Sequence, residues 1–296
     1  MESQELQGFL EYIQLDKNYS PHTVKEYESD LQQFIQFLKA EAISSFEEVE
    51  YVHARLFVTK LYDQKLARTT ISRKISAIRT FFSYLAKELQ VNSDAFQALF
   101  HPKQQKKLPQ FFYEEELQAL FEAAQGEQPL DLRNMALLEL LYATGMRISE
   151  LTNLEQDALD LSYGIVRVMG KGRKERYIPL GSFAQSALET YLQTARPRLM
   201  KAKDHEVVFV NHRGDPLTEM GVRHILQQIV KKSTLTKSIY PHMIRHTFAT
   251  HLLNNGADMR TVQELLGHSS LSSTQIYTHV TKDHLLSTYK NAHPRA

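Results

Sequence analysis

Apolar residues recur every three or four positions through most of the chain, which is the spacing of one face of an α-helix. In YSPHTVKEYESDLQQFIQFL, residues 19–38, Ser20 stands where an N-cap belongs and Pro21 occupies the first helical position. The segment RTTISRKISAIRTFFSYL, residues 68–85, carries an apolar stripe of the same spacing. Both patterns predict amphipathic helices, and the first hundred residues are expected to be helical. The stripe of the second segment comprises Ile71, Ile75, Ile78, Phe82 and Leu85.

The helical periodicity is lost after residue 100. HPKQQKKLPQ is polar and basic between two prolines, which predicts a linker over 103–110. We therefore expect two domains, a helical one over 1–102 and a second one over 111–296.

The second domain combines both periodicities. Helical spacing returns in FYEEELQALFEAA and in LRNMALLELLYATG, which ends at a predicted C-cap, Gly145. GIVRVMGKGRKERYIPLG, residues 164–181, then predicts an antiparallel hairpin, and EVVFVN, residues 206–211, predicts a further strand. The sequence thus predicts a mainly α protein with a small antiparallel β-sheet in its second domain.

Composition narrows the protein class. The chain has 296 residues, 42% of them hydrophobic, which is enough for one large or two ordinary domains. No apolar run reaches the roughly eighteen residues that span a bilayer, and the N-terminus lacks a basic-then-apolar leader, so we expect a cytoplasmic protein without a membrane partner. The absence of cysteine excludes disulfides, thiolate catalysis and cysteine zinc sites, which leaves His, Asp and Glu as metal ligands.

Positive charge is concentrated locally, although the formal net charge is only +1. Between Arg55 and Arg79 there are seven basic residues and a single acid, Asp63. This asymmetry suggests a positive face that contacts phosphates, and a solvated helix surface is the alternative. The linker lysines suit a path along a duplex, although a plain surface linker fits equally well. The candidate DNA contacts are Arg68, Arg73, Lys74, Arg79, Lys103, Lys106 and Lys107.

Two motifs place a basic side chain at the end of a predicted element. Arg147, in TGMRISEL, follows the helix end at Gly145 and can be held at the domain surface, as an active-site group or as an ordinary structural arginine. MGKGRKER is not a phosphate-binding P-loop, because its glycine spacing is wrong and Gly172 follows Lys171 in place of Ser or Thr. Lys171 stands near the hairpin tip, where it is either a proton donor to a phosphodiester or a solvated lysine.

The segment YPHMIRHTFATHLL holds three histidines and an arginine. His242 can share a helix face with Arg245 and with His246. Histidines four residues apart can chelate zinc, but Arg245 would repel the cation and the usual glutamate is missing. Beside a phosphate, Arg245 can neutralise two oxygens while His242 takes or gives a proton. His246 and His251 are expected to pack or to hydrogen-bond.

The segment LLGHSSLSSTQIYTHV places His268 after Gly267 and Tyr277 nine residues later. A phenol has a pKa of about 10, so Tyr277 can attack phosphorus only if a base or nearby positive charge removes its proton. Chemistry alone does not select Tyr277 among the fourteen tyrosines.

Taken in order, these motifs resemble those of the tyrosine recombinase (phage integrase) family, in its Xer branch. The resemblance rests on TGMRISEL, GKGRKER, HMIRHTFATHLL and LLGHSSLSSTQIYTH, and it extends to SPHTVKEYESDLQQF and to the HPRA ending. Leucine is commoner in the family at the positions of Met146 and Ile244, and both differences exchange one apolar residue for another. The resemblance implies a two-domain clamp around double-stranded DNA, with an N-terminal core-binding domain of SAM-like fold and a tyrosine recombinase catalytic domain.

The resemblance also implies the reaction. Tyr277 attacks the scissile phosphate as the nucleophile and forms a 3′-phosphotyrosyl enzyme. Arg147, Arg245 and His268 stabilise the charge on the phosphate oxygens. Lys171 protonates the departing 5′-oxygen, His242 accepts the tyrosine proton and Glu150 orients the site. No metal or other cofactor is expected.

The resemblance also implies partners, because strand exchange needs two DNA sites and four protomers. The resemblance implies a dif-like DNA site, a heterotetrameric synapse with a XerD-type recombinase and an FtsK-type translocase, in the resolution of chromosome dimers during cell division. Residues 282–296 are expected to dock on a neighbouring protomer through Leu285, Leu286 and Tyr289, with packing on their own domain as the alternative. The paralogous Xer role, a DNA-binding protein without catalysis and a His-based metallohydrolase are the other hypotheses.

Overall fold

The computed structural model describes residues 4–91, 94–102, 110–170, 175–235, 239–267 and 282–296. The chain divides into two units, Met1–Lys107 and Leu108–Ala296. Helices make up most of both units, and strands are described in the second unit, which confirms the predicted fold class. In the described part of the chain, no helix is long and apolar enough to cross a bilayer.

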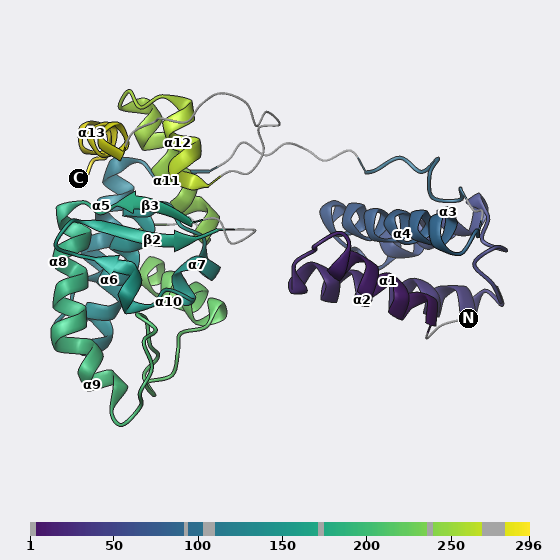
Figure 1. The fold of residues 1–296 in the computed structure, drawn as a ribbon, viewed down its shortest axis with the longest axis horizontal. Helices are drawn as coiled ribbons and strands as arrows, with labels where there is room; N and C mark the ends of the chain where they lie inside the picture. Colours follow the sequence, from purple (N-terminus) through teal and green to yellow (C-terminus); the bar gives the residue numbers. More distant parts are fainter. Residues whose placement is uncertain (1–3, 92–93, 103–109, 171–174, 236–238, 268–281) are drawn as a thin grey trace. The chain divides into compact units, whose positions relative to one another are not determined.

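Helices α1 (Gln4–Leu15), α2 (Pro21–Ala40), α3 (Tyr51–Asp63) and α4 (Arg68–Glu88) build the first unit (Figure 1). Helix α2 begins where the sequence predicts, because Ser20 Oγ accepts the backbone N–H of Thr23 at 3.3 Å. The core is aromatic, and the ring of Phe34 makes edge-on contacts with several others. These partner rings are Phe57, Phe82 and Phe96. The predicted apolar stripe of α4 is buried against this core.

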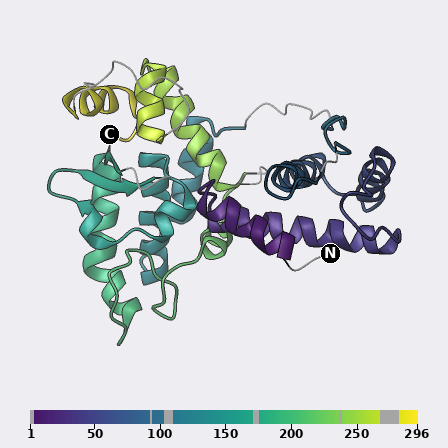
Figure 2. The ribbon, with the colours of Figure 1, turned by 45° about the vertical axis from the view of Figure 1, so that its right-hand side comes forward.

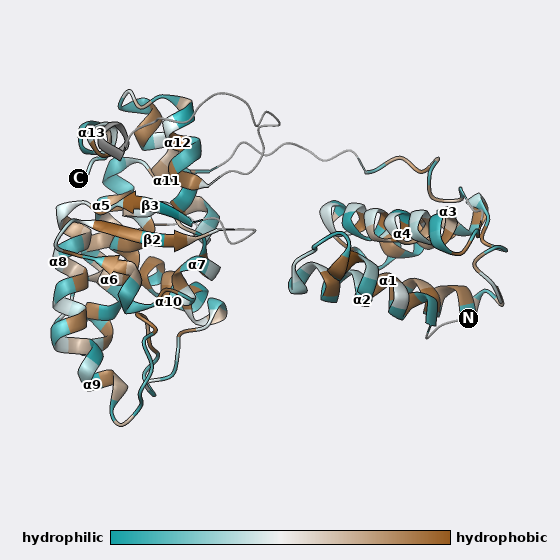
Figure 3. Cartoon of the chain, viewed as in Figure 1, coloured by the Kyte–Doolittle hydropathy of each residue, from teal (hydrophilic) through white to brown (hydrophobic). Residues whose placement is uncertain are grey.

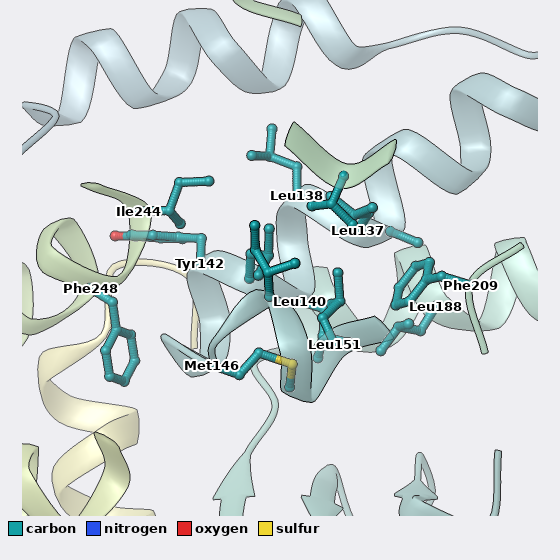
Figure 4. Close-up of a cluster of buried hydrophobic side chains, with 14 of the residues drawn as sticks. Leu137, Leu138, Leu140, Tyr142, Met146, Leu151, Leu188, Phe209, Ile244 and Phe248 are labelled. Atoms are coloured by element: carbon teal, nitrogen blue, oxygen red, sulfur yellow. The ribbon is translucent and has the colours of Figure 1, made fainter. Parts of the chain in front are cut away.

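The second unit is assembled around α6 (Pro129–Thr144), which is buried on nearly all sides. A helix that is apolar all round belongs in a core. Figure 4 shows Leu137, Leu138 and Leu140 of α6 among side chains that other elements contribute. The remaining helical elements before residue 235 are α5 (Glu114–Ala124), α7 (Ile148–Thr152), η1 (Gln156–Ala158), α8 (Ser182–Thr190), the π-helical turn η3 (Tyr191–Ala195), α9 (Arg196–Met200) and α10 (Glu219–Lys232).

The small sheet contains the predicted hairpin and one strand more. β2 (Ile165–Met169) and β3 (Glu175–Pro179) pair antiparallel, and β1 (Leu159–Asp160) pairs with the other edge of β2. Hydrophobic residues run along β2 (Figure 3). The strand expected over 206–211 is wrong, because its described residues make only isolated bridges. The apolar run is buried without the alternation of a half-exposed strand.

The chain ends with α11 (Pro241–Asn254), α12 (Met259–Leu266) and α13 (Lys282–Ala292), which lie side by side in the second unit (Figure 2). Tyr289 of α13 is only 1% exposed and belongs to the core of its own domain. Asn255 Nδ2 also donates to the carbonyl oxygen of Ala292 at 2.9 Å. Packing on its own domain, the alternative considered for this segment, is therefore correct for Tyr289.

Candidate active site

Arg147 lies directly after the end of α6. Gly145 ends that helix with a φ of 58°, as the sequence predicts for a C-cap. Arg147 is then the N-cap of α7, where its backbone N–H donates to Glu150 Oε2 at 2.7 Å and its Nη1 donates to Glu150 Oε1 at 2.9 Å. The Arg147 side chain is 37% exposed, so the guanidinium is held in place and still open to a ligand.

Glu150 accepts hydrogen bonds from two arginines. Arg176 of β3 donates from Nη1 to Oε1 at 2.9 Å and from Nη2 to Oε2 at 2.8 Å, in addition to the bonds from Arg147. Burial raises the pKa of Glu150, but the hydrogen bonds and charges of Arg176 and Arg147 outweigh it and lower that pKa overall. Glu150 is therefore an ionised carboxylate at neutral pH that fixes two guanidiniums.

Arg245 of α11 connects the ends of two helices. Its Nη1 donates to the carbonyl oxygen of Gly145 at 2.7 Å, and its Nη2 donates to that of Leu266 at 2.6 Å. Both carbonyls lie at helix C-termini, where the partial charge is negative. Burial, with a smaller effect from Arg147, lowers the pKa of Arg245 to about 10, which leaves it protonated at neutral pH.

The described part of this site carries an excess of positive charge. It brings together three guanidiniums, those of Arg147, Arg176 and Arg245, with one carboxylate, that of Glu150. Arg245 is anchored by carbonyl oxygens and has no carboxylate partner among its described hydrogen bonds. An excess of this kind suits a phosphate, whose oxygens accept charge-assisted hydrogen bonds from guanidinium groups.

The histidines of α11 have different environments. His242 is exposed in the first turn of the helix, three residues before Arg245. His251 is buried, with Nδ1 2.8 Å from the Tyr142 hydroxyl and Nε2 2.9 Å from the carbonyl oxygen of Phe112. The expectation that His251 hydrogen-bonds is confirmed, whereas the proton-accepting role of His242 stays a prediction.

Three predicted catalytic residues, Lys171, His268 and Tyr277, lie outside the described residues. Their roles stay predictions.

Arg176 was missed by the sequence reasoning. It is the last residue of the motif GKGRKER, but nothing local shows that a strand residue will reach a carboxylate 26 positions earlier in the chain. A charged residue beside the alternating apolar positions of a hairpin is the only signal available.

The candidate DNA contacts of the first unit make bonds within that unit. Lys74 is 7% exposed and pairs with Asp30 at 2.7 Å, so it does not lie on the predicted positive face. Arg73 pairs with the same carboxylate, and Arg79 Nε donates to the carbonyl oxygen of Phe96 at 2.8 Å. Arg68 is exposed. The linker residues Lys103, Lys106 and Lys107 are outside the described part of the chain.

Comparisons with known proteins agree with this arrangement. The model of the phage integrase family matches residues 110–284, and that of the phage integrase N-terminal SAM-like domain matches residues 6–89. The tyrosine recombinase XerC of Bacillus subtilis (strain 168) is 52% identical over 290 residues, covering 97% of this chain and 95% of the relative. That of Bacillus licheniformis is 54% identical with the same coverage. A crystal structure of the XerH site-specific recombinase bound to difH substrate is 28% identical with a TM-score of 0.68, covering 97% of this chain and 84% of that one.

The chain therefore belongs to the phage integrase family of tyrosine recombinases. It is a site-specific DNA recombinase, an enzyme that breaks and rejoins DNA strands. Within the Xer branch, the motifs VQELLGH and HLLSTYKNAHPRA favour XerC over its paralogue XerD, and the relatives named XerC confirm that resemblance.

Proposed function

We propose that this recombinase has the XerC role in a two-recombinase system. It acts in the cytoplasm on a dif-like site of double-stranded DNA, in a heterotetrameric synapse with a XerD-type partner, and an FtsK-type translocase controls the reaction. The product is a resolved chromosome dimer at cell division. The observation that carries this proposal is the near full-length identity of about half to proteins named XerC. The XerH structures with difH support a dif-like substrate.

Cleavage follows from the proposed site residues. Tyr277 Oη attacks the phosphorus and the bond to the 5′-oxygen breaks, which leaves a 3′-phosphotyrosyl bond. His242 takes the phenolic proton, and Lys171 gives a proton to the departing 5′-oxygen. Attack by a 5′-hydroxyl of the partner duplex reverses these steps and joins exchanged strands. Each step conserves the phosphodiester bond, so the chemistry needs no external energy source.

Arg147 and Arg245 act on the phosphate in both directions. Their guanidiniums bind the non-bridging oxygens, where charge grows in the transition state, and His268 adds a hydrogen bond. The contacts that support this role are the carboxylate of Glu150 on Arg147 and the two helix ends on Arg245. Because these partners hold the guanidiniums in place, little reorganisation is needed when the charge develops.

Trapping of a covalent complex on DNA tests the proposal. The full-length protein is incubated with a nicked duplex that carries a dif-like site, with and without a XerD-type recombinase, and then denatured. We expect a protein–DNA adduct that resists denaturation, survives chelator and is absent in Tyr277→Phe. Specific retention of the duplex without any adduct would instead support a DNA-binding protein without catalysis, and loss of the adduct with chelator would support a metal-dependent reaction.

A further inference from the structure

Arg176 makes three hydrogen bonds to two different segments of the chain. Nη1 and Nη2 donate to the two oxygens of Glu150, and Nε donates to the carbonyl oxygen of Leu265 at 3.0 Å. The side chain is 12% exposed. Arg176 therefore connects β3 with α7 and with the last turn of α12.

These bonds close a ring of polar contacts around the site. Arg176 holds the carbonyl oxygen of Leu265, and Arg245 holds that of the next residue, Leu266. Arg245 also holds Gly145, which is two residues before Arg147. Arg147 then returns to Arg176 through their shared carboxylate. The two phosphate-binding arginines are thus joined twice, once through Gly145 and once through Arg176.

The carboxylate in this ring has no spare capacity. Glu150 Oε1 accepts from both guanidiniums, and Oε2 accepts from the Arg147 backbone N–H and from Arg176. A carboxylate has about four acceptor positions, so loss of Arg176 leaves two of them empty inside the protein. Lysine cannot replace the planar fork, because a single ammonium cannot bridge both carboxylate oxygens and a carbonyl in this geometry.

We propose that Arg176 is a positioning residue of the recombination reaction, which fixes the place of Arg147 through Glu150 and the end of α12 through Leu265. The proposal rests on the function proposed above. Its hydrogen bonds go to protein acceptors, so Arg176 acts through its neighbours and not on the phosphate. The end of α12 is the segment that leads to His268, which gives the contact with Leu265 a second consequence for the site.

Arg176→Lys and Arg176→Gln test the proposal in the nicked-duplex assay with the XerD-type recombinase. We expect DNA affinity within about twofold of the wild type, and a rate of adduct formation lower by roughly tenfold for Lys and a hundredfold for Gln, the size of one or two lost charge-assisted bonds. Arg167→Lys is the matched control. Arg167 is on the neighbouring strand β2 and also pairs with two acids, Asp157 and Glu175, but it lies on the sheet surface.

The pH profile separates positioning from a general structural role. Among the described residues, the charged groups around Glu150 are Arg147, Arg176 and Arg245, and removing Arg176 lets burial raise the pKa of the carboxyl. The charged form of Glu150 is present above its pKa, so the acid-side loss of adduct formation should move to higher pH in Arg176→Gln and stay in place in Arg167→Lys.

The outcomes distinguish the inference from the proposed function. No adduct with the wild-type protein overturns the proposed function itself. A wild-type adduct, with Arg176→Lys forming it at the wild-type rate, overturns the inference alone. The inference also fails if the Arg176 variants lose DNA affinity and melting temperature in proportion to their loss of adduct-formation rate. It fails as well if the pH at which Arg176→Gln loses adduct formation on the acid side is the same as in the wild type.

Discussion

Gly145 ends α6 in a conformation that only glycine adopts without strain, and replacing it should damage both stability and catalysis. Its φ is 58°, and a Cβ atom there would lie 2.5 Å from Phe248 Cδ1 and 2.9 Å from Leu266 Cδ2. Left-handed backbone costs a non-glycine residue about 1–2 kcal/mol. Overpacking in a filled core destabilises the protein by about 1–3 kcal/mol more. Alanine also reduces the conformational freedom of the unfolded chain, which stabilises the folded protein by about 0.4–1 kcal/mol. We therefore expect Gly145→Ala to lower the free energy of unfolding by about 1–4.6 kcal/mol.

Gly256→Ala is the control for backbone strain alone. Gly256 has a φ of 92°, and a Cβ atom there would meet nothing within 4 Å. The backbone strain and the stiffening of the unfolded chain remain, so the expected loss of unfolding free energy is about 0–1.6 kcal/mol. The difference between the two variants isolates the contact with Phe248 and Leu266.

Urea titration followed by circular dichroism measures both variants, since the chain has no tryptophan for fluorescence. The adduct assay adds a second readout, because the Gly145 carbonyl anchors Arg245 and should move with the strained turn. A Gly145→Ala variant that loses no more stability than Gly256→Ala would refute the argument from packing.

Two buried carboxylates give further predictions. Asp30→Ala leaves the Lys74 ammonium buried without its partner and removes an anchor of Arg73, so unfolding of the first unit should be easier by about 3–5 kcal/mol in urea titrations; a loss below about 1 kcal/mol would contradict it. Arg295→Ala leaves Glu139 buried without its partner. Burial raises the pKa of Glu139, and the hydrogen bond from Arg295 opposes this effect. Because Arg295→Ala removes that bond, the pKa of Glu139 should rise further in the variant. A raised carboxyl pKa costs stability only above its unfolded value, so the variant's deficit should grow as the pH rises from about 4 to 7, and an equal deficit at both pH values would contradict it.

Sequence patterns predicted the elements whose signals are local. Ser20 and Gly145 are single residues that determine how a helix starts or ends, and both act as predicted. The hairpin of β2 and β3 is also local, because its two strands flank one turn. The strand expected over 206–211 was wrong because its buried residues, Val208, Phe209 and Val210, are consecutive and show no alternation that distinguishes a strand from an irregular segment.

The burial of Lys74 and the role of Arg176 were not predicted for a different reason. Their partners are distant in the chain. Lys74 lies three residues after Ile71 and one before Ile75, so helix geometry alone places it on the edge of the buried stripe. A lysine remains there only because Asp30 supplies a counter-charge 44 residues away. Arg176 likewise depends on Glu150. Pairings of this kind need the tertiary structure, because no local pattern specifies them.

The glycines and the arginines of the site depend on the same geometry. Gly145 and Gly267 end α6 and α12 in the left-handed conformation, and the last carbonyl groups of both helices are left without helical partners. Arg245 binds one carbonyl at each end, so two helix ends position its guanidinium, and its described hydrogen bonds go to no carboxylate. A carboxylate in that place would cancel the charge that the proposed contact with a phosphate needs. Backbone carbonyls orient the guanidinium and leave its full charge for the proposed phosphate contact.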